Sequence, residues 1–293
     1  MKPIYLIIIA GLLILAGLLT GHFIKSKTDV TEPASPYEKE ILTWHENRIK
    51  SLQRDQGWLT LVALTWLKEG QNELESIGMI TLRDTIPFFA SLPTVTATLK
   101  EKPVQSLILK TDADKGGPDK ITSGTKTFAV IKRGGKFAIR MWDTESPVRK
   151  EFTGIDRFPV DEKWKIEARW EPYPEFKKVT IPTVVPGIFE TGMAPGVAVF
   201  SLDGQEYRIE PVSDDSLKEF SFIFSDLTAG HETYGGGRFL DTSGPVNGKV
   251  ILDFNKAYNP PCAFTSFATC PVPLPQNRLG VRIEAGEKKA GKH

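Results

Sequence analysis

The chain has 293 residues, and its 37 Lys and Arg side chains nearly balance its 36 Asp and Glu side chains, which leaves a formal net charge of +1. Because basic and acidic residues are interleaved, this balance argues against the broad basic surface that nucleic-acid-binding proteins normally carry. Hydrophobic residues make up 40% and charged residues 25% of the sequence, as in ordinary globular proteins, so we expect one large or two modest domains.

The first apolar stretch, residues 4–24, predicts a membrane anchor within residues 1–24. As an α-helix it would be about 31 Å long, which matches a hydrocarbon core of roughly 30 Å. A cleaved signal peptide is the main alternative, but a cleavage site needs small residues at positions −3 and −1, and Leu19–Gly21 and Thr20–His22 fit that pattern poorly. A buried helix of the folded domain is a third alternative. A short N-terminal tail before a large C-terminal domain favours a single-pass protein with a periplasmic or other extracytoplasmic domain.

A polar segment with two prolines, residues 25–36, predicts a linker between this span and the folded domain. After it, residues 37–54 predict an amphipathic helix that lies on the domain, because apolar residues recur at helical spacing. Ser35 is suited to cap this helix, and Glu38 three residues later would complete a capping box. The predicted apolar face consists of Ile41, Trp44, Ile49 and Leu52.

From residue 57 onward the pattern changes to strands and turns. Residues 57–67 are dense in apolar side chains and predict a buried element, either a strand or a short helix. Glycine-containing turns at 133–136 and 203–204 predict hairpins. Other short strands are predicted, from alternation and β-branched residues, at 72–76, 79–82, 94–99, 106–110, 127–132, 136–142, 164–173, 179–185, 197–202, 205–211, 219–225, 237–240 and 248–254.

Short strands at this spacing predict an all-β fold, an antiparallel sandwich or barrel, with one N-terminal amphipathic helix and one N-terminal transmembrane helix. A connecting segment near residues 143–160 separates two groups of predicted strands. We therefore expect two β subdomains. The first covers residues 37–142 and includes the helix, the second covers residues 143–288, and residues 289–293 form a tail.

The segment from Asp253 to Leu279 is predicted to be neither a helix nor a regular strand. Its prolines fix φ and lack an amide hydrogen, so they force an extended, irregular path. Such a path is stable only where side chains satisfy its backbone groups. The residues suited to that role are Asn255, Asn259, Thr265, Thr269 and Asn277.

The same segment holds both cysteines of the chain, Cys262 and Cys270. In an extracytoplasmic domain they are disulfide candidates, and closing this small loop would stabilise the fold by about 2.5 kcal/mol in the loop-entropy model. Two buried free thiols are an equal alternative. A metal site is not expected, because no histidine lies between residues 248 and 292. We expect no cofactor either.

His231 is the one histidine placed for chemistry, in a polar loop after a predicted strand. With Asp226 or Asp253 as its partner, it is the candidate acid–base group of a hydrolase-like enzyme. The alternative is an exposed turn residue without a catalytic role. Serine-nucleophile motifs and paired-histidine zinc motifs are absent from the sequence.

The run Gly235–Arg238 predicts an anion site, because its glycines could leave amide groups open while the arginine clamps the anion. The alternative is a tight turn in which Arg238 forms an internal ion pair. The candidate partners of that pair are Asp226, Asp241 and Asp253. Around the anion site, the residues predicted to bind a ligand are Arg238, Tyr234, Asn255, Tyr258 and Asn259.

Five stretches of the sequence carry a resemblance to a known family. They are Gly57–Val62, Ser146–Arg149, Glu232–Leu240, Leu252–Phe264 and Ala285–Lys288. Together they resemble the signature of a bacterial and archaeal family, domain of unknown function 1684, over about residues 40 to 288. Because that family has no assigned activity, the resemblance implies no reaction and carries over no functional residues.

Two interpretations of the function follow. The first is a membrane-anchored, extracytoplasmic β domain that binds a small ligand, anionic ligands included, or a component of the cell envelope. The second is the hydrolase-like enzyme built on His231. We favour binding, because a pocket is enough for it, whereas acid–base catalysis needs a convergent set of groups. Neither interpretation includes a nucleic acid as a partner.

Overall fold

The structure is a computed structural model, and it describes residues 35–213 and 218–290. The predicted anchor or signal at 1–24 and nearly all of the predicted linker lie outside the described residues. Within the described ranges, no helix is both long and apolar enough to cross a membrane.

Helix α1 (Pro36–Leu52) confirms the helix predicted over residues 37–54. Ser35 caps it as expected, because its hydroxyl oxygen accepts a hydrogen bond from the amide of Glu38 at 3.1 Å. That bond satisfies one of the free amides of the first turn. Three residues of the helix are buried: Ile41, His45 and Leu52.

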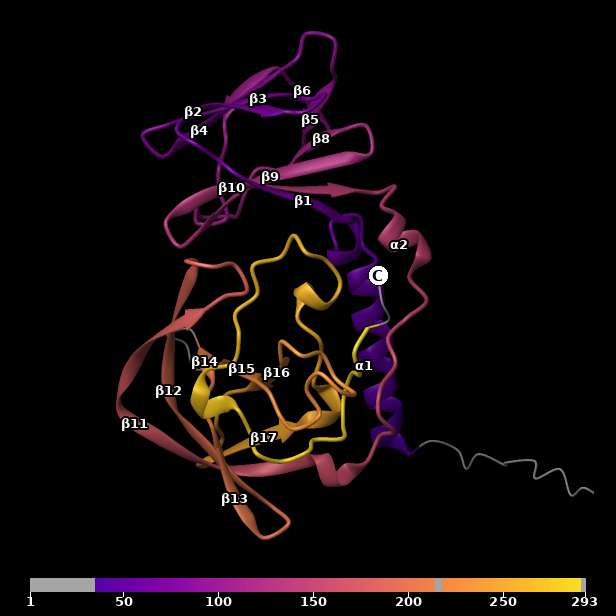
Figure 1. The fold of residues 1–293 in the computed structure, drawn as a ribbon, viewed down its shortest axis with the longest axis vertical. Helices are drawn as coiled ribbons and strands as arrows, with labels where there is room; N and C mark the ends of the chain where they lie inside the picture. The colour runs from indigo at the N-terminus through magenta and orange to yellow at the C-terminus, as the bar shows by residue number, and fades with distance from the viewer. Residues whose placement is uncertain (1–34, 214–217, 291–293) are drawn as a thin grey trace, which may run out of the picture. The chain divides into compact units, whose positions relative to one another are not determined.

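The strands between residues 61 and 143 form two antiparallel sheets (Figure 1). One has six strands in the order β1-β10-β9-β8-β5-β6, and the other has four in the order β2-β3-β4-β7. Their apolar faces share one core, in which the rings of Phe89 and Phe128 meet edge to face with centroids 5.2 Å apart. The strands are β1 (Leu61–Trp66), β2 (Gly70–Leu74), β3 (Gly78–Arg83), β4 (Ile86–Ser91), β5 (Ala97–Leu99), β6 (Lys102–Val104), β7 (Ser106–Ile108), β8 (Ile121–Ser123), β9 (Lys126–Arg133) and β10 (Lys136–Asp143).

The strands from residue 165 to residue 253 form a third antiparallel sheet, in the order β16-β15-β14-β12-β11-β17, with β13 paired to β12. Its core includes the fully buried rings of Phe220, Phe222, Phe224 and Phe254. Among the described residues, no strand pairing joins this sheet to the first two. The strands are β11 (Lys165–Pro182), β12 (Phe189–Leu202), β13 (Gln205–Ile209), β14 (Val212–Ser213), β15 (Glu219–Phe224), β16 (Arg238–Ser243) and β17 (Lys249–Asp253).

The all-β class is therefore confirmed, with antiparallel, nearly barrel-like sheets and few helices. The division into two subdomains near residues 143–160 stays a prediction. Both predicted hairpin turns are observed, between β9 and β10 and between β12 and β13. Gly134, Gly135 and Gly204 have positive φ values there, a conformation that glycine adopts without strain.

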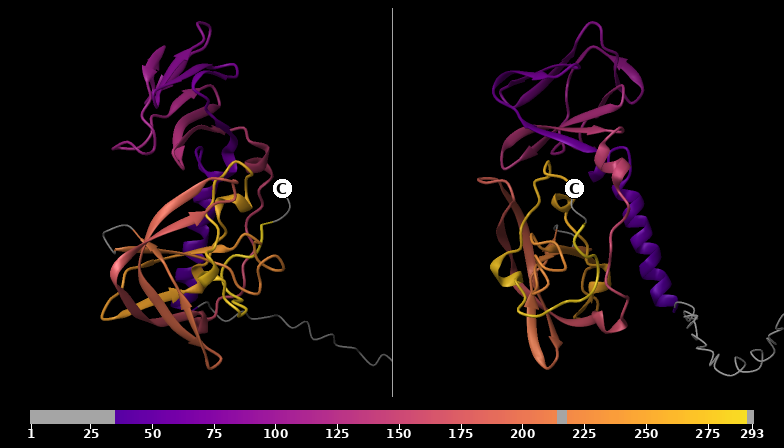
Figure 2. Two further views of the ribbon diagram at one scale, coloured as in Figure 1. Left: turned by 60° about the vertical axis from the view of Figure 1, so that its left-hand side comes forward. Right: turned by 45° about the vertical axis from the view of Figure 1, so that its right-hand side comes forward.

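Some elements differ from the sequence prediction. The ambiguous element at 57–67 contains both alternatives, a 3₁₀ helix (Trp58–Thr60) followed by strand β1. The strands predicted at 164–173 and 179–185 form one long strand, β11, whose register shifts between Pro172 and Lys177 (Figures 1 and 2). Proline cannot donate to the ladder, so the strand bulges there rather than ending.

Four strands and one helix were not predicted: β4, β6, β8, β14 and the short helix α2 (Pro147–Glu151). Strand β4 escaped notice because apolar residues occupy both of its faces, and Ile86 and Phe88 remain 50% and 41% exposed. Two short 3₁₀ helices flank the third sheet in the sequence, Glu162–Trp164 before strand β11 and Phe254–Lys256 after strand β17.

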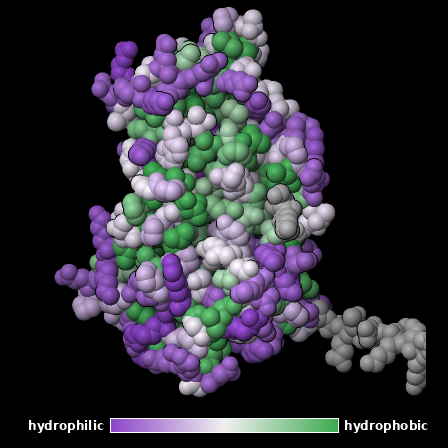
Figure 3. Space-filling model, in the orientation of Figure 1, coloured by the Kyte–Doolittle hydropathy of each residue, from purple (hydrophilic) through white to green (hydrophobic). Residues whose placement is uncertain are grey.

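The closing segment, residues 254–288, follows the irregular path that its prolines predict. Only the 3₁₀ helices Phe254–Lys256, Pro261–Ala263 and Pro275–Asn277 interrupt it. Its polar side chains satisfy backbone groups elsewhere. For example, the Asn277 amide donates to the carbonyls of Ile223 and Glu210 at 3.0 and 2.8 Å. On the face drawn in Figure 3, hydrophobic residues gather in the middle and hydrophilic residues dominate above and below.

Candidate ligand-binding site

Arg238 is not open to a ligand in this structure. Its side chain is 1% exposed, and it forms an ion pair with Asp226 at 3.2 Å, the alternative that the sequence left open. The guanidinium also donates to the carbonyls of Ile283, at 2.9 Å, and Ala285. Its hydrogen bonds therefore tie strand β16 to the closing segment, and the role of Arg238 as an anion clamp stays a prediction.

Asn255 and Asn259 are fully buried and hold backbone segments together. The Asn255 amide donates to the Asp161 carbonyl and to the Tyr37 hydroxyl, both at 2.9 Å. The Asn259 amide donates to the Lys288 carbonyl at 2.7 Å. Both asparagine amide groups therefore donate to the chain itself, although the Oδ1 atom of Asn259 is buried without a hydrogen-bond partner among the described residues.

The two predicted ligand tyrosines also have internal partners. The Tyr258 hydroxyl donates to Asp241 at 2.6 Å, and burial raises the pKa of this tyrosine well above its usual range. The Tyr234 hydroxyl donates to the carbonyl of Cys262 at 3.3 Å. The five residues predicted to bind a ligand therefore have structural contacts instead of a shared opening.

His231 lies exposed in a turn, where its backbone amide donates to the Thr228 carbonyl at 3.1 Å. Among the described residues, no hydrogen bond or ion pair joins its imidazole to Asp226 or Asp253. Asp226 is committed to Arg238, and Asp253 accepts a hydrogen bond from Tyr37 at 2.7 Å. The structure therefore does not assemble the acid–base pair that the hydrolase interpretation requires.

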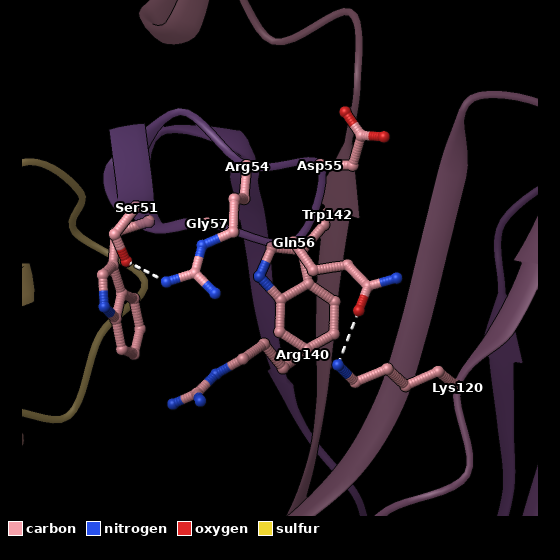
Figure 4. A pocket seen from close by; sticks show the side chains of 9 residues that line it. Ser51, Arg54, Asp55, Gln56, Gly57, Lys120, Arg140 and Trp142 are labelled. Atoms are coloured by element: carbon pink, nitrogen blue, oxygen red, sulfur yellow. Dashed lines mark hydrogen bonds between the residues drawn. The ribbon is translucent and has the colours of Figure 1, made fainter. Parts of the chain in front are cut away.

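A different opening, a pocket of about 580 Å³, lies between the end of α1 and strand β10 (Figure 4). Arg140 and Trp142 are two positions apart on β10, so their side chains lie on the same face of the strand. The turn after α1 supplies the opposite wall. The lining residues are Ser51, Arg54, Asp55, Gln56, Gly57, Trp58, Lys120, Arg140 and Trp142.

Gly57 brings that wall close to the helix end. A Cβ atom at this position would lie 2.2 Å from the carbonyl oxygen of Leu52, a distance that no side chain tolerates. The Gly57 amide donates to the carbonyl of Arg54 at 2.7 Å and closes the turn. The glycine thus lets the chain turn sharply, so that Trp58 follows directly as a pocket wall.

Arg140 is the unusual group of this pocket. Its side chain is only 9% exposed, yet it makes no hydrogen bond or ion pair with any residue in the described ranges, and its Nε atom is buried without a partner. Its guanidinium lies 5.1 Å from the ring centre of Trp58. Burial, assisted by the positive charge of Arg133, lowers the pKa of Arg140 to about 10, so the group remains charged at neutral pH.

No carboxylate of the described residues forms an ion pair with Arg140, although Glu190 attracts its charge from a distance. Asp112, which acts on it from a distance, is paired with Arg133. Asp55, the one carboxylate of the pocket wall, is paired with Arg149 at 2.7 Å. A buried charge without an ion-pair partner is unfavourable in a protein interior, so an anion bound in the pocket would stabilise Arg140.

Two more cations face the opening. The Lys120 amine donates to the Gln56 amide oxygen at 2.5 Å and lies 5.8 Å from the ring centre of Trp142 (Figure 4). Arg54 donates to the hydroxyl of Ser51. Together with Arg140, these give the wall three positive charges against one negative charge, a formal excess of +2. Lys120 and Gln56 also line a neighbouring pocket of about 450 Å³.

Sequence reasoning missed this site, although one signal was present. Arg140 interrupts the strand Phe137–Trp142, in which the other residues are apolar. An arginine in a buried strand normally has a carboxylate partner, and the run Phe137–Trp142 itself contains none. Within residues 35–213 and 218–290, no cluster of three or more His, Cys, Asp or Glu residues could hold a metal ion.

Residues 150–288 match the model of a family described as "Protein of unknown function (DUF1684)". The predicted resemblance is thus confirmed over these residues. A solved structure, an uncharacterised protein of Haloarcula marismortui determined by NMR in solution, is 26% identical with a TM-score of 0.42. The match covers 50% of this chain and 81% of that protein. None of the curated proteins matches this chain.

Proposed function

Because residues 150–288 belong to a family whose description assigns no function, we propose a function from the site itself: the chain binds a small anionic ligand in the pocket around Arg140. The observation that carries this proposal is the buried Arg140 side chain, which forms no ion pair or hydrogen bond with the described residues. The ligand supplies the missing negative charge, as a carboxylate or a phosphate group.

The chemistry of the wall fits such a ligand. A guanidinium binds carboxylate and phosphate oxygens through two parallel hydrogen bonds, and these bonds are stronger where water is excluded. Arg140 is held against Trp58, so its orientation is set before the ligand arrives. Lys120 and Arg54 are exposed and add long-range attraction at the mouth.

The size of the pocket also fits. A volume of about 580 Å³ lies within the range of small-molecule sites, and the two tryptophans offer apolar walls for the uncharged part of a ligand. The ligand is therefore larger than a bare inorganic ion, and it carries its negative charge at the end that reaches Arg140.

We also propose that residues 1–24 anchor the chain in a membrane and that the domain lies on the extracytoplasmic side. The apolar length of residues 4–24 supports this placement. A protease added to intact spheroplasts should then degrade the domain. Degradation only after lysis would contradict the placement, and the binding proposal would stand unaffected.

Native mass spectrometry tests the binding proposal on the full chain, purified gently in detergent from its own host. We expect an additional mass at fixed stoichiometry in the wild type and none in Arg140→Met, because methionine keeps the apolar stem but removes the charge. Arg83→Met is the matched control, since Arg83 is an exposed arginine of β3 outside the pocket.

The control should retain the additional mass. The proposal would be contradicted if Arg140→Met retained the additional mass as fully as the wild type does. It would also be contradicted if the wild type showed no additional mass, even after carboxylate or phosphate compounds were added.

A further inference from the structure

The two cysteines of the chain lie against one another, although eight positions separate them. The amide of Cys262 donates to the sulfur of Cys270 at 3.1 Å, and the amide of Cys270 donates to the sulfur of Cys262 at 3.4 Å. Each sulfur is thus next to the other residue's backbone. Both thiols are free in this structure.

The reciprocal bonds set the geometry of the pair. Neither amide donates to a backbone carbonyl, so each sulfur is the hydrogen-bond acceptor that satisfies it. The 3₁₀ helix Pro261–Ala263 holds Cys262, and Pro271 fixes the chain directly after Cys270. Little conformational freedom remains to be lost if a bond forms between the two sulfurs.

The two thiols differ in access. Cys262 is half-buried and lines a cavity of about 540 Å³, whereas Cys270 is 5% exposed. Much of the cavity wall is apolar, and it includes Phe264 and Phe267. A reagent that enters the cavity therefore meets Cys262 first.

The two thiols also differ in acidity. The hydrogen bond from the Cys270 thiol lowers the pKa of Cys262, and the Cys270 amide and the positive charge of Arg140 act in the same direction. The pKa of Cys270 is raised, by its hydrogen bond to Cys262 and by burial. An accessible thiolate beside a buried thiol is the arrangement of an attacking and a resolving cysteine.

From this arrangement we infer that Cys262 and Cys270 are a redox-active dithiol, which an external disulfide oxidises reversibly to an intramolecular disulfide. The Cys262 thiolate attacks one sulfur of the oxidant, forms a mixed disulfide and releases the first oxidant thiolate. The Cys270 thiol then gives up its proton, attacks the sulfur of Cys262 and releases the second. Two thiols of the chain are oxidised and one disulfide is reduced to two thiols.

A glutathione titration of the full-length wild type tests this inference. The protein is equilibrated with mixtures of reduced and oxidised glutathione, quenched with acid, unfolded, alkylated with N-ethylmaleimide and weighed by mass spectrometry. We expect two alkylation sites in reducing mixtures and none in oxidising ones, lost together in one two-electron transition. Dithiothreitol should restore both sites.

Two outcomes would overturn the inference. One is alkylation of both cysteines in the most oxidising mixture. The other is an end state with glutathione on Cys262 and no bond between the two cysteines. Both outcomes report only the oxidation state of the two cysteines, so the proposed function is tested separately, by ligand binding.

Two variants assign the roles of the sulfurs. Cys270→Ser should accumulate the mixed disulfide on Cys262, because the resolving thiol is gone. Cys262→Ser should leave Cys270 unmodified in the folded protein, because Cys270 is buried. Rapid glutathione addition to Cys270 in folded Cys262→Ser would reverse the assignment and contradict the mechanism, and the wild-type titration does not depend on either variant folding.

Discussion

Arg238 and Arg140 are both buried arginines, and their surroundings are opposite. Arg238 is 1% exposed and has a carboxylate and two carbonyls as acceptors. Arg140 is 9% exposed and has no acceptor among the described residues. Folding alone explains the first, because its ion pair and hydrogen bonds offset the cost of burial. It does not explain the second, which suggests that a partner outside the chain completes it.

The same contrast separates the two regions around them. In the closing segment, buried polar groups such as Asn255 and Asn259 bind other parts of the chain. In the pocket at the end of α1, the positive charges exceed the negative ones. Arg140, Lys120 and Trp58 also precede residues 150–288, so the family match does not reach the proposed site.

The largest expected effect follows removal of the Arg238 charge. Arg238→Met leaves Asp226 buried without its cation, so we expect the free energy of unfolding to fall by about 3–5 kcal/mol. Denaturant titration measures it. Arg282→Met is the control, because the ion pairs of Arg282 are exposed and should matter little. If the free energy of unfolding fell by similar amounts in both variants, the buried ion pair would stabilise the fold no more than the exposed ones.

A smaller loss is expected for Asn255→Ala. The variant leaves the Asp161 carbonyl and the Tyr37 hydroxyl with fewer partners in a partly buried place, which should cost about 1–3 kcal/mol. Gln71→Ala, at an exposed position of β2, should change the unfolding free energy little. If Asn255→Ala were as stable as the wild type but no longer bound a ligand, Asn255 would be a ligand-binding residue instead.

The smallest of these stability effects concerns pH. Burial lowers the pKa of His45, whose Nε2 donates to the Ile155 carbonyl at 3.0 Å. The unfolded chain then binds more protons than the folded one below the usual histidine pKa of about 6.5, so stability should fall as the pH drops below that value. Between pH 7 and pH 5, the free energy of unfolding should depend less on pH in His45→Gln than in the wild type. An unchanged slope would contradict this role of His45.

The parts of the fold that local patterns determine could be predicted from the sequence. Helix α1 has its own cap and apolar spacing, and the hairpin at Gly134–Gly135 has its own turn residues. Strand β4 was missed because whether Phe88 is exposed depends on which strands cover it, which is not a local property.

The roles of the polar residues could not be predicted in the same way. The sequence offered three acids as partners of Arg238, and only the packing of β16 against the closing segment selects Asp226. Arg140 presents the reverse case. The informative observation is that its Nε atom has no hydrogen-bond acceptor. Such an absence can be recognised only when all neighbours in space are known.

The comparison of the two arginines is tested most directly by thermal unfolding of the wild type and Arg140→Met, in sodium phosphate and in sodium chloride at equal ionic strength. Phosphate is the probe because it carries the charge that the site lacks. Its general stabilising effect is common to both proteins and cancels between them.

In chloride, Arg140→Met should be at least as stable as the wild type, since it removes an uncompensated buried charge. Phosphate should stabilise the wild type more than the variant. The difference in unfolding free energy should grow with the logarithm of the phosphate concentration above the dissociation constant, to about 2.7 kcal/mol at a hundredfold excess. If instead Arg140→Met lost stability as Arg238→Met does, and phosphate shifted both midpoints equally, Arg140 would be a structural residue like Arg238.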